Sequence, residues 1–165
     1  MNDLENKMDF PSGPLLGVDY GTVRIGLAVS DRDQKIAVPF RIYQRQTPAL
    51  DARFFTELSK SQEIVGLIVG LPLHLSGAEG AKAKEARQFA AWLRQTTGLP
   101  VAFCDERYSS VEAWNYLKEG GLKAARRKKQ LDKVAAQVIL QSYLDARKDN
   151  DSIRLEDQNE QKTAE

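Results

Sequence analysis

The chain has one cysteine, Cys104, and almost no excess charge, with a formal net charge of +1 over 165 residues. A single cysteine excludes an internal disulfide and cannot build a sulfur-rich zinc site. The small net charge excludes a generally basic nucleic-acid-binding protein, so a polyanion would have to bind at a local patch. Cys104 itself is expected to be a small buried residue on a strand.

Long apolar runs are also absent from the sequence. No segment reaches the roughly 18 consecutive apolar residues that a membrane span needs, which argues against a membrane partner. Residues 1–7 are polar and acidic, unlike a secretory signal. We therefore expect a soluble, cytoplasmic protein whose length fits one domain.

Both ends of the chain are polar. Residues 1–13 close with Pro11, Ser12 and Gly13, and residues 148–165 are rich in charged and amide side chains with few apolar anchors. Such segments bury too little apolar surface to order themselves. The sequence thus predicts flexible tails at 1–13 and 148–165 around a folded domain over 14–147.

The apolar pattern of the folded part changes character midway. Three strand-like runs with short connections, which favour an antiparallel meander, cover residues 15–19, 25–30 and 36–43. Helical and strand patterns then alternate over residues 49–60, 64–69, 78–96, 101–104, 110–119 and 130–147. Alternation of this kind is typical of parallel crossovers covered on both faces. We predict an α/β fold with a mixed five-stranded sheet, three antiparallel strands followed by two parallel ones, and helices on both faces.

Asp19 ends the first predicted strand and is followed by Gly21 and Thr22. A carboxylate at the end of a buried strand is costly to desolvate unless a cation, a hydrogen-bond donor or water satisfies it. Gly21 would allow a ligand or a neighbouring backbone to approach closely, and Thr22 offers a hydroxyl. The alternative is a turn aspartate that bonds nearby backbone amides.

Asp105 and Glu106 follow the predicted strand at 101–104. Successive strand residues point to opposite faces, so at most one of the two side chains can face the same pocket as Asp19. The alternative is a charged turn into a helix, since Ser109 and Glu112 have capping-box spacing.

Asp132 lies near the start of the last predicted helix. An aspartate there is ordinarily a favourable partner of the helix dipole, which is the alternative to a site role. Asp132, Ala136, Ile139 and Tyr143 follow the spacing i, i+4, i+7 and i+11, so they share one helix face. We expect that face to pack inward and to hold the carboxylate beside the core.

The three acids together are more informative than each alone. Side chains from the first strand, a later parallel strand and the last helix can meet at the carboxyl-end edge of a mixed sheet. Such hard oxygen ligands suit Mg²⁺ or Mn²⁺. Two such ions can activate a water molecule and stabilise the leaving oxygen of a phosphodiester.

Six segments of the chain, in their order and spacing, resemble the YqgF family of bacterial proteins, which is related to the RuvC Holliday junction resolvases. The matching segments are Leu16-Gly17-Val18-Asp19-Tyr20-Gly21-Thr22, Ile25-Gly26-Leu27-Ala28-Val29-Ser30-Asp31, Ile68-Val69-Gly70-Leu71-Pro72-Leu73, Asp105-Glu106-Arg107-Tyr108-Ser109-Ser110, Gly120-Gly121 and Asp132-Lys133-Val134-Ala135-Ala136. The resemblance implies an RNase H-like three-layer fold. It also implies that Asp19, Glu106 and Asp132 are the catalytic, metal-binding acids, a choice between Asp105 and Glu106 that strand alternation leaves open.

The family is described as nucleases of pre-16S ribosomal RNA 5′-end maturation and also as Holliday junction resolvases. The resemblance therefore implies a metal-dependent hydrolase of phosphodiester bonds in ribosome biogenesis, with structured RNA as substrate. One alternative is a resolvase of branched DNA, which would need two symmetric sites and hence a homodimer. Another is a non-catalytic RNA-binding or ribosome-assembly module.

A further alternative is an ATPase. The segment from Asp19 to Thr22 also resembles the phosphate loop of the actin, Hsp70 and hexokinase superfamily. Those proteins close two RNase H-like domains around a nucleotide, whereas this chain has room for one.

Several residues outside the acids are candidates for contact with nucleic acid. The densest basic run, which follows Gly120-Gly121, consists of Lys123, Arg126, Arg127, Lys128 and Lys129. Its alternative is a solvated loop. Next to the acids, Arg24 and Arg107 are candidate phosphate contacts and Thr22 a candidate auxiliary residue.

His74 departs from the family pattern, which has asparagine or a similar polar residue there. We interpret His74 as a surface residue, with proton transfer or phosphate contact as the alternative. Trp92 and Trp114 are expected to pack on helix faces.

Overall fold

A computed structural model describes residues 8–107, 126 and 134–149 of the chain. Its sheet has the strand order β3-β2-β1-β4-β5. The strands are β1 (Leu15–Asp19), β2 (Arg24–Ser30), β3 (Ala37–Gln44), β4 (Gly66–Leu71) and β5 (Val101–Asp105). β1 pairs antiparallel with β2 and parallel with β4, β2 pairs antiparallel with β3, and β4 pairs parallel with β5. The predicted mixed sheet, with three antiparallel strands followed by two parallel ones, is confirmed.

Two helices lie between strands, as predicted. α1 (Pro48–Ser61) begins after Thr47, whose side chain accepts a hydrogen bond from the Leu50 amide, as expected of an N-cap. α2 (Ala81–Thr97) ends at Gly98, which adopts the left-handed conformation with φ +70°. A further helical segment covers residues 134–149. The helix predicted near residues 110–119 lies outside the described residues.

The predicted bounds are displaced at two places. β4 begins two residues later than predicted, because the Ile64 amide donates to the Ser59 carbonyl at the end of α1. α2 begins three residues later, because the residues before it form a hairpin. In this hairpin Leu73 pairs with Glu79 and the His74 amide donates to the Ala78 carbonyl.

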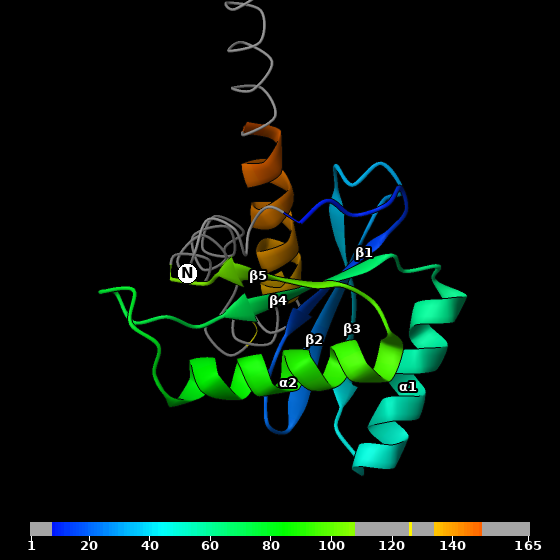
Figure 1. Cartoon of the computed structure of the whole chain (residues 1–165), viewed down its shortest axis with the longest axis horizontal. Helices are drawn as coiled ribbons and strands as arrows, with labels where there is room; N and C mark the ends of the chain where they lie inside the picture. Colours follow the sequence, from blue (N-terminus) through cyan, green and yellow to red (C-terminus); the bar gives the residue numbers. More distant parts are fainter. Residues whose placement is uncertain (1–7, 108–125, 127–133, 150–165) are drawn as a thin grey trace, which may run out of the picture.

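The sheet has a helical layer on each face, as predicted (Figure 1). Strand alternation sorts the core into two clusters. Leu16 and Val18 of β1 pack in the cluster that includes Phe55 of α1 and Phe89 of α2. The opposite face of the sheet packs Leu15, Ile68, Ala102 and Cys104 against buried residues of the 134–149 segment. Cys104 is buried, as expected.

The 134–149 segment lies directly against β1. A Cβ atom added to Gly17 would lie 2.7 Å from Leu140 Cβ and 3.0 Å from the Ala136 carbonyl oxygen. Ala136, Ile139 and Tyr143 are buried, so the inward face predicted from their spacing is confirmed for these three residues. Asp132, the fourth member of that pattern, lies outside the described residues.

Phe10 corrects the predicted N-terminal tail. The tail was expected to extend through residue 13, but the Phe10 ring is buried in the core beside Tyr143. A Cβ atom on Gly66 would overlap this ring, so the ring occupies space that the glycine leaves open. Phe10 and the partly buried Met8 thus attach the start of the described chain to the core.

No helix in the described part of the chain is long and apolar enough to cross a membrane.

Candidate functional site

A cavity of about 340 Å³ lies where the carboxyl ends of β1 and β4 meet the start of α2. We call it the acid cavity. It is lined by Asp19, Tyr20, Gly21, Thr22, Gly70, Pro72, Lys82, Glu85, Ala86 and Glu106. Two of the three predicted acids, Asp19 and Glu106, therefore line one cavity although they are far apart in the sequence.

Asp19 is held at the cavity by the tight turn between β1 and β2. It is the last residue of β1, pairs with Gly26 of β2 and is half-buried. The turn that follows requires Gly21, because a Cβ atom there would overlap the Arg24 carbonyl oxygen. The glycine next to Asp19 therefore serves a close backbone approach, one of the two roles considered from the sequence.

Glu106 continues the β5 edge of the sheet past the end of the strand. Its amide donates to the Leu71 carbonyl at 3.1 Å, so the pairing with β4 extends by one residue. Its carboxylate lies over Gly70, where a Cβ atom would overlap Glu106 Oε1 and lie 2.6 Å from Ile139 Cδ1. Gly70 therefore leaves the space that the Glu106 carboxylate occupies.

The surroundings of Glu106 disfavour its charge. Desolvation by burial is the largest cause, followed by the negative charges of Asp19 and Asp105, and together they raise the pKa of Glu106 to about 8. Burial and the neighbouring acids therefore favour the protonated form of this carboxyl group near neutral pH. An acid with a pKa perturbed by burial and by another acid is a physical marker of a functional site.

Asp105 and Glu106 point to different places, as strand alternation predicted. Asp105 forms an ion pair with Arg107 at 2.6 Å and accepts the Arg107 amide at 3.0 Å. Arg107 also donates to the Leu75 carbonyl at 3.4 Å, which ties the hairpin before α2 to the end of β5. The predicted phosphate contact Arg107 is therefore already engaged with a carboxylate.

The first turns of α2 form a wall of the acid cavity that the sequence analysis missed. Lys82, Glu85 and Ala86 follow the spacing i, i+3 and i+4, so they share a face of the helix. The signal available in the sequence was a helix that starts shortly after a buried strand, with charged residues at this spacing. Without the strand order, nothing indicated that this face would lie opposite Asp19.

The remaining predicted site residues are spread around the acid cavity or lie beyond the described part. Thr22 lines the cavity and is exposed. Arg24 is exposed and lines an adjoining hollow of about 290 Å³ that also contains Asp19. His74 is exposed, as expected, and its ring packs against Gly80. Arg126 is exposed as well. Asp132, Lys123, Arg127, Lys128 and Lys129 lie outside the described residues.

The described residues do not complete a metal site by themselves. Within residues 8–107, 126 and 134–149, no group of three or more His, Cys, Asp or Glu side chains is arranged to hold a metal ion. Asp19 and Glu106 are thus two acids of a predicted set of three.

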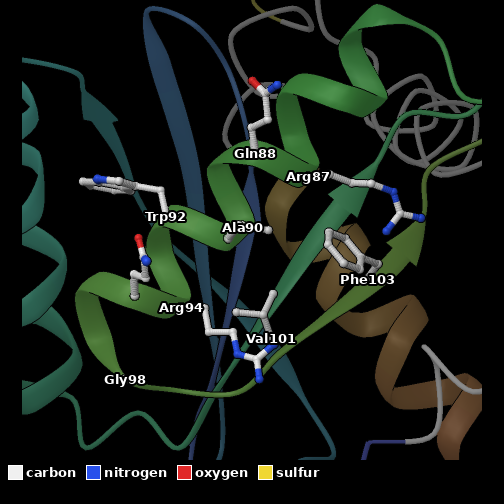
Figure 2. Close-up of a pocket in the computed structure, with 10 residues that line it drawn as sticks. Arg87, Gln88, Ala90, Trp92, Arg94, Gly98, Val101 and Phe103 are labelled. Carbon is white, nitrogen blue, oxygen red and sulfur yellow. The ribbon is translucent and has the colours of Figure 1, made fainter.

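A larger hollow of about 890 Å³ lies between α2 and β5 (Figure 2). Its lining contains no carboxylate, so it lacks the acidic chemistry of the smaller cavity. Arg87 lies over the Phe103 ring at 4.8 Å and forms an ion pair with Glu79. Trp92 stacks on Phe89, which confirms its predicted packing role, whereas Trp114 lies outside the described residues.

The chain is similar to known proteins over most of its length. A family model described as "RuvX: Holliday junction resolvase" matches residues 13–146. A Rhodopirellula baltica protein named "Putative pre-16S rRNA nuclease" is 47% identical over 138 residues, which cover 83% of this chain and 80% of that protein. A protein of the same name from Maridesulfovibrio salexigens is 41% identical over 132 residues, covering 79% and 96% respectively.

Among solved structures, the chain is similar to Thermus thermophilus RuvC in complex with a Holliday junction substrate. The TM-score is 0.50 with 18% sequence identity, and the match covers 79% of this chain and 93% of that one. At this identity the likeness shows the fold alone, which is RNase H-like. The family match over residues 13–146 and relatives above 40% identity show that the chain belongs to the RuvX (YqgF) family.

Proposed function

We propose that this chain is a metal-dependent nuclease that hydrolyses phosphodiester bonds at the acid cavity, in the 5′-end maturation of pre-16S ribosomal RNA. The observation that carries the proposal is the convergence of Asp19 and Glu106 on one cavity. The names of the relatives, pre-16S rRNA nucleases, support this substrate over others.

The chemistry of the acid cavity fits a hard divalent cation. Its potential ligands are carboxylates, and its lining contains neither histidine nor cysteine. Burial first, and the charges of Asp19 and Asp105 second, raise the pKa of Glu106, and a bound cation would stabilise its ionised form. Asp19 and Glu106 would hold Mg²⁺ or Mn²⁺, with Asp132 as the proposed third acid. The bound metal would supply Lewis-acid activation of the attacking water and charge stabilisation at the phosphate.

Support for Asp132 comes from the helix that follows it. The described helical segment begins two residues after Asp132, and its Ala136 carbonyl lies close to Gly17 of β1. Ile139, one turn further on, lies beside Gly70 under the Glu106 carboxylate. The same helix face that carries Ala136 and Ile139 includes Asp132 in the sequence pattern.

The rest of the chain's proposed machinery binds and orients the strand to be cut. Arg24 lies exposed in the hollow next to Asp19 and is a proposed phosphate contact. Arg107 is a second one, acting from its ion pair with Asp105. The basic run from Lys123 to Lys129 is the proposed outer contact with the RNA backbone.

The second candidate function is resolution of Holliday junctions. It is favoured by the description of the family model and by the RuvC-like fold. A resolvase cuts two strands symmetrically and therefore needs a dimer. Sedimentation of the protein with and without a four-way DNA junction would reveal such a dimer.

The proposed function is tested by cleavage of two labelled substrates with Mg²⁺ or Mn²⁺. One is an RNA that spans the 5′ end of 16S rRNA with its leader, and the other is a four-way DNA junction. We expect the wild type to cut the RNA at a defined position, and Asp19→Asn and Glu106→Gln to abolish cutting with an intact fold. Both substitutions remove charge but little volume.

Asp33→Asn is the matched control, because Asp33 is an exposed aspartate in the turn between β2 and β3. It should cut as the wild type does. Equal cutting by wild type and Asp19→Asn would contradict the proposed role of the acid cavity. RNA binding without any cutting would favour a non-catalytic assembly module.

A further inference from the structure

The acid cavity has an uneven balance of charge. Three acidic side chains line it, those of Asp19, Glu85 and Glu106, and the raised pKa of Glu106 favours its protonated form. Among the described residues that line it, Lys82 is the one basic side chain. A phosphodiester that enters this cavity brings a further negative charge. The affinity of the cavity for the phosphodiester therefore depends on the position of Lys82.

The helix fixes where this lysine stands. Ala83 and Ala86 are fully buried in a small cluster with Leu71 at the end of β4, which anchors the first turns of α2. Lys82 and Glu85 flank these anchors on the cavity side. Because the buried alanines fix the backbone of the first turns of α2, the position of the Lys82 Cα atom is fixed. The long, exposed Lys82 side chain can extend from it.

Within the described residues, two arginines close to the end of β5 and the start of α2 are ion-paired, whereas Lys82 is not. Arg87 forms an ion pair with Glu79, and Arg107 forms one with Asp105. Lys82 is exposed and makes no hydrogen bond or ion pair within the described part of the chain. Its ammonium group is thus available to a ligand in the cavity.

We propose that Lys82 is the phosphate-positioning residue of this site and binds a non-bridging oxygen of the substrate strand across the cavity from Asp19 and Glu106. The proposal rests on the proposed nuclease function and deepens it. A lysine suits this task because its ammonium is a compact point charge on a flexible stem. Glu85, one turn further along α2, weakens phosphate binding because its negative charge repels the phosphate.

The volume of the acid cavity limits the size of the ligand that Lys82 can contact inside it. About 340 Å³ is near the lower end of the roughly 300–1,000 Å³ typical of ligand pockets. This volume admits about one sugar–phosphate unit of a strand at a time. The ligand class is therefore the sugar–phosphate backbone of one nucleic-acid strand.

Lys82→Gln and Lys84→Gln form a matched pair for the test. Both lysines are exposed in the first turns of α2, but Lys84 does not line the acid cavity. The two variants remove the same charge and keep a good helix former. Lys82→Arg restores the charge, and thermal unfolding checks that all variants fold alike.

The first measurement is binding of a fluorescein-labelled single-stranded RNA in EDTA over a range of KCl concentrations. For Lys82→Gln we expect several-fold weaker binding and a log–log salt slope smaller in magnitude by about 0.7, the value for one lost phosphate contact on a single strand. Lys84→Gln should keep the slope, and Lys82→Arg should restore it. Glu85→Gln should bind more tightly, since it removes a repelling charge. Equal losses in Lys82→Gln and Lys84→Gln would overturn the proposal.

The second measurement separates binding from chemistry. In cleavage assays with Mg²⁺, Lys82→Gln should raise KM with a smaller change in kcat, because the contact is already made in the ground state. A wild type that cuts neither substrate would contradict the proposed function, while the binding comparison in EDTA would still decide the role of Lys82. A wild type that cuts, with Lys82→Gln kinetically identical to Lys84→Gln, would overturn the role of Lys82 alone.

Discussion

At the scale of single residues, the position of the Glu106 carboxylate at the acid cavity depends on the absence of a side chain at Gly70. Gly70 of β4 leaves the space in which the Glu106 carboxylate lies, and Ile139 bounds that space from the opposite layer. The sequence predicted an acid at this place through resemblance. It gave no reason to connect that acid with a glycine more than thirty positions earlier, because their proximity depends on the pairing of β4 with β5.

Gly70→Ala should therefore damage the site more than the fold. The atoms nearest to the new methyl group belong to the ends of the Glu106 and Ile139 side chains, so we expect a destabilisation of about 1 kcal/mol, at the low end for overpacking. Displacing the Glu106 carboxylate should lower cleavage by roughly 10²-fold, the cost of a 1 Å misplacement. Cleavage rates and urea unfolding measure the two effects.

Gly98→Ala is the control for that variant. Gly98 has φ +70° and no neighbouring atom within 4 Å of an added Cβ, so the substitution strains the backbone without touching the acid cavity. It should cost stability, about 1 kcal/mol, and leave cleavage unchanged. If Gly70→Ala cuts as well as Gly98→Ala, the coupling of Gly70 to Glu106 is wrong.

A second coupled pair, Tyr43 and Asp51, stabilises the junction of β3 with α1. The Tyr43 hydroxyl donates to the buried Asp51 carboxylate at 2.7 Å, and the Gln46 amide donates to the same oxygen at 2.9 Å. Desolvation by burial and then the hydrogen bond to Asp51 raise the pKa of Tyr43 to about 12. The fold thus favours the neutral phenol.

This raised pKa predicts a loss of stability at high pH. The unfolded tyrosine titrates near 10, so the stabilisation is complete below pH about 10 and is lost as the pH rises through about 12. Tyr43→Phe should be less stable than wild type at pH 8 by about 1.5 kcal/mol or more, because a hydrogen bond to a charged group is lost.

The difference in the free energy of unfolding between wild type and Tyr43→Phe, measured by urea unfolding, should become smaller between pH 10 and pH 12. Tyr20→Phe is the control, since the Tyr20 hydroxyl makes no hydrogen bond within the described residues. A difference that stays constant across this range would contradict the assigned pKa.

At the scale of elements, the contact between β1 and the 134–149 segment organises the molecule. The sequence predicted that Ala136, Ile139 and Tyr143 face inward, because a helical spacing needs no knowledge of the partner. It did not predict that Gly17 would be that partner, since the approach of a helix to one strand depends on the whole sheet.

Gly17→Ala should be more destabilising than Gly70→Ala. The added methyl group would meet the Cβ of Leu140 and a backbone carbonyl, and neither can yield without moving the helix. We expect a loss of about 2–3 kcal/mol in the free energy of unfolding, within the range for overpacking. Urea unfolding measures it, and a change below about 0.5 kcal/mol would mean that this helix is not packed on β1 as described.

The same helical segment also reaches Ala37, the first residue of the edge strand β3. Gln141 accepts the Ala37 amide at 2.8 Å, and Gln137 donates to the Ala37 carbonyl at 3.0 Å. These side chains satisfy backbone groups that an exposed edge would offer to another chain. Local sequence patterns cannot reveal such a contact, because it joins residues about a hundred positions apart.

At the scale of the whole molecule, the order and type of the elements followed from apolar periodicity, and the RNase H-like fold followed from the resemblance. The strand order β3-β2-β1-β4-β5 then supplies what local patterns lacked. It brings the end of β1 and the end of β5 to either side of β4, so that Asp19 and Glu106 meet at one edge. It also places the first turns of α2 at the acid cavity. The sequence alone could not predict that Lys82 would line this cavity, because that depends on the strand order.

The central claim is that Asp19, Glu106 and Asp132 share a hard cation, and calorimetric titration with Mn²⁺ tests it most directly. Wild type and Asp33→Asn should bind the ion alike. Asp19→Asn, Glu106→Gln and Asp132→Asn should each bind it at least tenfold more weakly, since each removes a proposed ligand. Undiminished Mn²⁺ binding by Asp19→Asn and Glu106→Gln would contradict the account.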